Sequence, residues 1–228
     1  MKKLRWALAA LVVVVALVLA APFVYKAARG GDDEPAAAVV AEGTETPTVD
    51  VDGQWTVVPG NPPNTTSAGY TVDEILRGEP VTVVGSTDQV AGNATIDGTA
   101  LTEARFEVQV AGITTDSGSR DNQFRGARIA DTATHPTATI VLAEPTEPTT
   151  VPDDGSTTTV PVQVELTIKG TTVLKPVDVT VLRTGDRLVA SGAIPVEWSE
   201  VGVEPPNLGF VTVAPNGTID FLVSLEKR

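Results

Sequence analysis

The stretch VPVQVELTIKG, residues 160–170, decides what fold to expect. Apolar residues take every second position, and polar residues or proline fill the positions between them. A period of two places the two sets on opposite faces of a β-strand, so one face is buried and the other meets solvent. The face predicted to be buried carries Val160, Val162, Val164, Leu166 and Ile168.

The same alternation recurs in residues 104–112, 176–186 and 218–227. Glycine-bearing connections at 97–99, 183–186 and 215–218 lie beside such runs, as hairpin turns do. The polar partners in the last run, including Asp220 and Ser224, are expected to face solvent. The apolar positions predicted to point inward are Phe106, Val108, Val110, Val177, Val179, Val181, Ile219, Phe221, Val223 and Leu225.

No long amphipathic helical pattern follows Tyr25, so the body reads as an all-β protein. About eight to ten hairpin-connected strands predict an antiparallel barrel or a sandwich. Residues 144–161, rich in Pro, Thr and Asp, are expected to form a long exposed loop between two strands. A barrel of eight strands has room for one small ligand inside.

Composition limits the chemistry. The chain has 228 residues and no cysteine, which excludes disulfides, a thiolate nucleophile and a cysteine-based metal site. Aromatic residues make up only 4%, so the core must be built mainly from Val, Ile, Leu and Ala. The net charge of −13 repels phosphate backbones, and nucleic acid is therefore excluded as a partner.

The amino terminus contains an uncharged, mostly apolar run from Trp6 to Tyr25. It follows Lys2, Lys3 and Arg5, and it is about long enough to cross a bilayer as one helix. We predict a signal anchor over residues 1–29 that holds the protein to the cell membrane as a single-pass transmembrane helix. The alternative is a cleaved signal peptide, which would release a secreted protein.

The rest of the chain divides into a tether and a folded body. Residues 30–52 have no period and are rich in acidic residues, Ala, Thr and Pro, which predicts a flexible acidic linker. Residues 53–228 form the predicted β-domain. With either reading of the amino terminus, this domain is expected to be extracytoplasmic.

Candidate catalytic residues are few. His135 is the only histidine, no Gly-x-Ser-x-Gly motif marks a nucleophile, and a zinc site would need more His or Cys. His135 stands before a proline and a predicted strand, where a structural role or a ligand contact is expected rather than catalysis. Arg120, Asp121 and Arg125 either brace the loop through hydrogen bonds or meet a ligand head group. We predict that the protein is not an enzyme and has neither a metal nor a cofactor.

Four segments together suggest a family. The stretch TTDSGSRDNQFRGARIADTATHPTATIVL, residues 114–142, resembles the core signature of the YceI-like family, with Arg-Asp, a later Asp and a residue-Pro pair before the next strand. The segments GQWTVVPGNPPNTTSAGYTVDEIL, VELTIKGTTVLKPVDVTV and GAIPVEWSEVGVEPPNLGFVTVAPNGTIDFLVSLEK are similar to its other blocks in the same order. The resemblance covers about residues 53–228. His135 stands where the family often has an aromatic residue, and the loop 144–161 is enlarged.

This resemblance implies an extended, lipocalin-like antiparallel β-barrel that binds isoprenoid lipids, such as polyprenyl chains or quinones, in the cell envelope. It implies no catalytic activity. The alternative is a structural or interaction module of the envelope whose barrel is filled with side chains and binds nothing. Arg120, Asp121, Arg125 and His135 would then only brace the loop. The residues predicted to line an apolar tunnel are Trp55, Phe106, Val108, Val110, Val162, Val164, Leu166, Val179, Val181, Phe221 and Val223.

Overall fold

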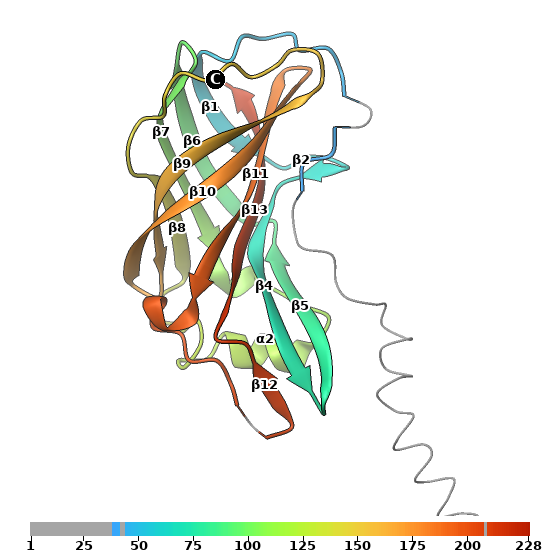
Figure 1. Ribbon diagram of the computed structural model, residues 1–228, viewed down its shortest axis with the longest axis vertical. Coiled ribbons are helices and arrows are strands. Elements are labelled where there is room, and N and C mark those ends of the chain that lie inside the picture. Colours follow the sequence, from blue (N-terminus) through green and yellow to red (C-terminus); the bar gives the residue numbers. More distant parts are fainter. Residues whose placement is uncertain (1–37, 42–43, 208) are drawn as a thin grey trace, which may run out of the picture.

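The computed structural model describes residues 38–41, 44–207 and 209–228. Most of these residues belong to antiparallel strands, and the short helices lie near one end of the molecule (Figure 1). The helices are η1 (Val110–Gly112), α2 (Gly118–Phe124) and η2 (Trp198–Val201). The strands are β1 (Gly53–Val58), β2 (Gly60–Asn61), β3 (Asn64–Thr65), β4 (Ser67–Leu76), β5 (Glu79–Thr87), β6 (Val90–Asp97), β7 (Ala100–Gln109), β8 (Thr137–Leu142), β9 (Thr157–Ile168), β10 (Thr171–Thr184), β11 (Arg187–Glu197), β12 (Val211–Val213) and β13 (Asn216–Lys227).

Eight of the strands close into a barrel. Their order is β1-β6-β7-β8-β9-β10-β11-β13, and β13 returns to pair with β1. All of these pairings are antiparallel, which confirms the predicted all-β antiparallel barrel. Closure leaves these eight strands without a free edge.

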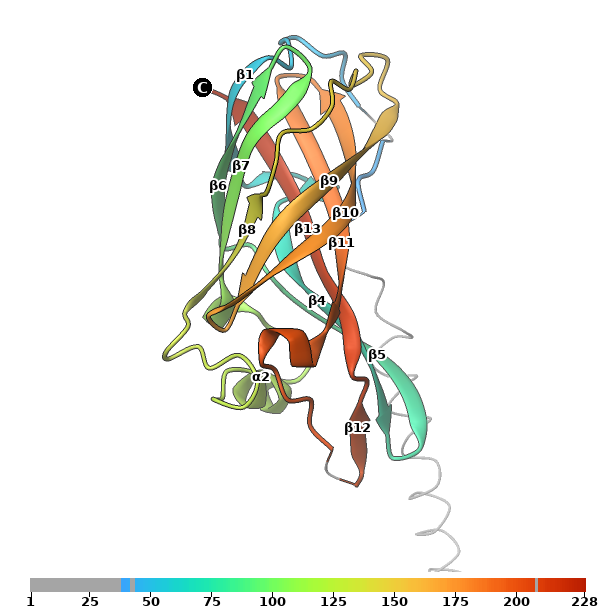
Figure 2. The ribbon, with the colours of Figure 1, turned by 60° about the vertical axis from the view of Figure 1, so that its left-hand side comes forward.

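Strand β13 changes partner along its length, and this shapes the interior. Its first part pairs with β4, from Thr218 opposite Thr71 onward, and its last part pairs with β1, up to Lys227 opposite Trp55. Strands β4 and β5 therefore replace β1 and β6 in the wall of the lower half of the molecule as drawn in Figure 2. The carboxyl end of β4 also pairs with β12, so a three-stranded flap projects below the barrel.

The alternation in residues 160–168 appears as predicted. Val160, Val162, Val164 and Leu166 are buried, whereas Pro161 and Glu165 between them are exposed. The predicted turns at 97–99 and 183–186 join β6 to β7 and β10 to β11. The connection predicted at 215–218 is wrong, because Asn216 already begins β13 and β12 pairs with β4 instead. A side chain at Gly217 would collide with the neighbouring backbone of β4. This close approach explains why a glycine stands inside the strand.

Part of the outer barrel face is also buried, contrary to expectation. Asp220 and Ser224 are only 2% and 1% exposed, although their parity places them on the outside of β13. The Thr71 hydroxyl donates to Asp220 Oδ2 at 2.5 Å, and the Ser224 hydroxyl donates to the Asn64 carbonyl at 2.7 Å. The β2–β3 hairpin lies against Ser224, and Thr71 of β4 lies against Asp220, so period-two alternation fails to predict solvent here.

The segment that precedes β1 follows the barrel surface in its described part. The Asn64 side chain donates to the Val40 carbonyl and accepts from the Val40 N–H, both at 2.9 Å. Val39 packs on an outward-facing apolar cluster of Leu182, Val189 and Leu222. Over residues 38–41 and 44–52, the segment predicted as a flexible linker therefore makes defined contacts with the domain.

Two sequence predictions concern helices. The predicted anchor at residues 1–29 lies outside the described residues, and within the described ranges no helix is both long enough and apolar enough to span a bilayer. The stretch 118–124 was expected to be a loop, but it forms the short helix α2. Seven residues give too short a repeat for an amphipathic pattern to stand out in the sequence.

Candidate functional site

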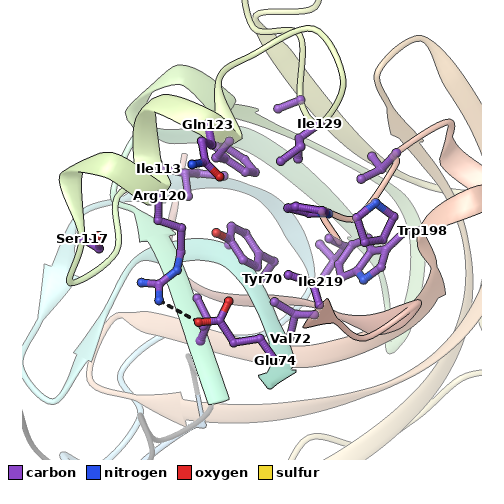
Figure 3. Close-up of a pocket in the computed structure, with 18 of the residues that line it drawn as sticks. Tyr70, Val72, Glu74, Ile113, Ser117, Arg120, Gln123, Ile129, Trp198 and Ile219 are labelled. Atoms are coloured by element: carbon purple, nitrogen blue, oxygen red, sulfur yellow. Dashed lines mark hydrogen bonds and ion pairs between the residues drawn. The ribbon is translucent and has the colours of Figure 1, made fainter. Parts of the chain in front are cut away.

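The lower half of the molecule contains a cavity of about 820 Å³. Its volume lies within the range typical of small-molecule sites, roughly 300–1,000 Å³. Exposed residues of the β4–β5 turn and Phe210 belong to its lining, so the cavity opens at the lower end. Most of the surrounding surface is apolar (Figure 3), and the lining includes Tyr70, Val72, Val83, Ile113, Phe124, Ile129, Trp198 and Ile219.

A second, smaller cavity of about 130 Å³ lies in the upper half. Three residues, Ala68, Val108 and Ile140, line both cavities and mark the boundary between them. The upper cavity is the smaller of the two, and Trp55 of β1 fills part of the upper half with only 1% exposure. The interior therefore has a large lower cavity, and side chains fill most of the space above it.

The structure divides the eleven predicted tunnel residues between these two spaces. Val110 and Leu166 line the lower cavity, and Val108 lines both. All eleven thus lie along the interior, but most of them line the smaller, upper cavity. Their role as ligand contacts stays a prediction. The eight that line only the upper cavity are Trp55, Phe106, Val162, Val164, Val179, Val181, Phe221 and Val223.

The four predicted polar residues fall into two groups. Arg120 and His135 line the lower cavity. Asp121 is buried behind it and accepts hydrogen bonds from the Thr115 N–H and hydroxyl at 2.9 and 2.8 Å. The Arg125 guanidinium donates to the carbonyls of Ala111 and Ile113 in and after η1, at 2.9 and 3.3 Å. Asp121 and Arg125 thus fix α2 against the barrel.

Arg120 lies between two carboxylates at the cavity wall. One of its terminal nitrogens donates to Glu74 Oε1 at 3.1 Å, and the other pairs with Asp116. Burial by itself would lower the pKa of Arg120, but Glu74 and Asp116 together raise it above its usual value. Glu74 is only 7% exposed, which is unusual for a carboxylate and explains the need for a partner. The pair lies beside Tyr70 (Figure 3).

Two aromatic rings of the cavity wall pack directly against glycines. The Tyr70 ring stacks on Phe124 with a centroid distance of 5.2 Å, and a β-carbon added at Gly85 would come within 2.6 Å of it. A β-carbon at Gly217 would come within 2.5 Å of the Trp198 ring. Burial raises the pKa of the Tyr70 hydroxyl to about 12, so this group stays protonated at neutral pH.

Sequence reasoning missed Tyr70, Glu74 and Trp198. Residues Ala68, Tyr70, Val72, Glu74 and Leu76 share one parity on β4, and all of them line the lower cavity. A carboxylate on an otherwise apolar strand face was the available signal for Glu74. The signal was weak because the stretch 71–79 was equally compatible with a turn of helix.

Comparison with known proteins identifies a family and solved structures with a similar fold. A family model described as the YceI-like domain matches residues 55–225. No curated protein was found to match the chain. The crystal structure of BcnA from Burkholderia cenocepacia is similar, with 23% identity and a TM-score of 0.54 over 69% of this chain and 95% of that one. A polyisoprenoid binding domain from Saccharophagus degradans, implicated in plant cell wall breakdown, is 16% identical, with a TM-score of 0.58 over 76% of this chain and 98% of that one.

At these identities the solved structures establish similarity of fold alone. They agree with the closed antiparallel barrel described above. The family model covers well over half of the chain, from Trp55 in β1 to Leu225 in β13. The chain therefore belongs to the YceI-like family.

Proposed function

We propose that this protein binds an isoprenoid-type lipid, a polyprenyl chain or a quinone, and stores or transports it outside the cytoplasm while anchored to the membrane. The observation that carries the proposal is the apolar lower cavity of about 820 Å³ with an opening at one end. Membership of the YceI-like family supports lipid binding in general. The Saccharophagus degradans domain, which shares the fold, is a polyisoprenoid binding domain.

The energetics favour a long apolar ligand. Each methylene moved from water into the cavity contributes about 0.8 kcal/mol, from which the cost of ordering the chain is subtracted. Tyr70, Phe124 and Trp198 present broad aromatic surfaces for these contacts. A filled barrel without a ligand would need side chains in the lower chamber, and the described residues leave that chamber open.

No reaction forms part of the proposal. A binding function requires a shaped apolar wall and a polar end, and both are present in the lower half. Within the described ranges, no three His, Asp or Glu side chains converge as metal ligands would. The membrane anchor is proposed from the apolar run Trp6–Tyr25 and the cations that precede it.

Native mass spectrometry of the full chain, purified from membranes of its own host, tests the proposal. A bound species of isoprenoid mass that is lost on organic extraction is expected. Val72→Trp places an indole in the lower cavity and should abolish the bound species. Glu165→Trp, on the exposed outer face of β9, is the matched control and should retain it. An unliganded mass for the wild type, with no uptake of added lipid, would contradict lipid binding.

Membrane anchoring and the extracytoplasmic location of the barrel are tested separately. Fractionation should find the full chain in the membrane pellet, and carbonate washing should leave it there. Protease added to intact cells should digest residues 53–228. Recovery of a shortened chain in the medium would support cleavage and secretion in place of anchoring.

A further inference from the structure

Several polar groups of the lower cavity gather in one part of its wall. Glu74 and Tyr70 come from β4, whereas Arg120 and Gln123 come from α2. Figure 3 shows the Tyr70 hydroxyl and the Gln123 amide on the same side of the cavity as the Arg120–Glu74 pair. Asp116, which also lines the cavity, completes this group. We call these five residues the polar cluster.

The arginine of the polar cluster is already neutralised. Arg120 is paired with Glu74 and Asp116, so one positive charge faces two negative charges. Its donors are directed at these carboxylates and at the Thr115 hydroxyl. Low solvent access at Glu74 strengthens its interaction with Arg120 relative to a pair at a fully exposed site. A phosphate would have to displace a carboxylate from Arg120 or lie beside an unscreened negative charge.

The other cations of the cavity lining do not compensate. The Lys169 ammonium donates to the carbonyls of Arg128 and Gly202 at 3.1 and 2.8 Å. Arg77 is exposed in the turn of the flap, where solvent and salt screen its charge. Among the described residues, Arg77, Arg120 and Lys169 are the arginine and lysine side chains that line this cavity, and His135 is the histidine there.

The remaining members of the polar cluster suit a neutral oxygen. The Tyr70 hydroxyl and the Gln123 amide form no hydrogen bond with another described side chain, and both can donate to a carbonyl or hydroxyl oxygen. Because burial raises the pKa of Tyr70 to about 12, its hydroxyl keeps its proton and remains a donor. The second oxygen of Glu74 can accept from an alcohol.

We infer that the lower cavity selects isoprenoid lipids with a neutral, oxygen-bearing head group, a quinone or an alcohol, and discriminates against phosphorylated ones. Glu74 and Asp116 carry the discrimination, and Tyr70 and Gln123 supply the favourable contacts. The inference rests on the proposed lipid-binding function. It adds to that function a rule for the head group, set by the charges around Arg120.

A direct test compares farnesol with farnesyl phosphate, two lipids that have the same tail and differ in the head group. Titration of the full-length wild type should give a dissociation constant at least about tenfold lower for farnesol, a difference that is readily resolved. Glu74→Gln combined with Asp116→Asn preserves side-chain size but frees Arg120. This double variant should bind farnesyl phosphate at least about tenfold more tightly than the wild type does, so its preference for farnesol over farnesyl phosphate should fall.

Controls separate the possible failures. Glu165→Gln removes one charge from the outer face of β9 and should leave both constants unchanged. If the double variant does not fold, Asp116→Asn alone serves, because Asp116 is 38% exposed. Equal binding of the two lipids by the wild type, or an unchanged preference in the variants, overturns the selectivity and leaves lipid binding intact. Failure of both lipids to bind overturns the proposed function and this inference together.

Discussion

Asp220 is a carboxyl group on the outer face of β13 that solvent barely reaches. Burial raises its pKa above the usual range, and the hydrogen bond from the Thr71 hydroxyl opposes only part of that rise. The unfolded chain therefore releases this proton at a lower pH than the folded protein does. The stability contributed by protonated Asp220 is complete below the unfolded pKa and is lost as the pH rises through the folded pKa.

Asp220→Asn should remove this loss. The free energy of unfolding of the variant, relative to wild type, should increase as the pH is raised from about 4, near the unfolded pKa of an aspartate. Urea titrations at a series of pH values measure it. Asp178→Asn, on the exposed side of β10, is the control and should show no such trend. Parallel pH profiles for Asp220→Asn and wild type would contradict the argument.

The Tyr70 ring packs directly against Gly85. An added methyl group would lie within 2.6 Å of that ring, so Gly85→Ala should displace the ring from its stack on Phe124. Crowding of this kind costs about 1–3 kcal/mol. Urea unfolding should show the loss, together with weaker lipid uptake. Gly118→Ala, at a position with open space around it, should be close to neutral, and an equal effect at both sites would contradict this role for Gly85.

At the scale of elements, the segment 38–41 is hydrogen-bonded to the barrel through one side chain, beside the packing of Val39 on the outer apolar cluster. Asn64 in β3 both donates to and accepts from the backbone of Val40. Asn64→Ala removes two hydrogen bonds, each of which contributes about 0.5–1.5 kcal/mol. We expect the Val40 amide to exchange with deuterium about 5- to 30-fold faster, as a change of one or two kcal/mol implies.

Hydrogen exchange followed by mass spectrometry checks this expectation. Strands β9 and β10 should keep their protection, because their pairing does not depend on Asn64. Asn122→Ala, an exposed position on α2, serves as the matched substitution and should leave the segment 38–41 protected. Unchanged exchange at Val40 in Asn64→Ala would show that packing of Val39 on the outer apolar cluster holds the segment without this pair.

At the scale of the whole molecule, ligand binding and folding are linked. The lower cavity exists only when β4, β5, α2 and η2 are assembled around the barrel, so a lipid bound there stabilises the folded chain. A ligand at 100 times its dissociation constant should add about 2.7 kcal/mol to the free energy of unfolding. Thermal unfolding with and without farnesol measures this. Val72→Trp, whose indole occupies the cavity, should show no shift, and an equal shift in both proteins would place binding elsewhere.

The sequence alone determined the architecture of the barrel. Alternation in residues 160–168 predicted which side chains of β9 are buried, since a strand has only two faces and water is excluded from one of them. The turns after β6 and β10 were predictable from their glycines. Resemblance to the YceI-like signature over residues 114–142 predicted the family that the family model supports.

Tertiary structure alone decided where the chamber lies and what its polar side contains. Glu74 and Arg120 are distant in sequence, and their pairing depends on β13 changing partner from β4 to β1 and on α2 lying across the lower end. The burial of Asp220 and Ser224 likewise depends on contacts with distant residues. Period-two alternation describes the two faces of one strand. It carries no information about which later segment covers the outer face, or about where a barrel widens, because these depend on long-range pairing.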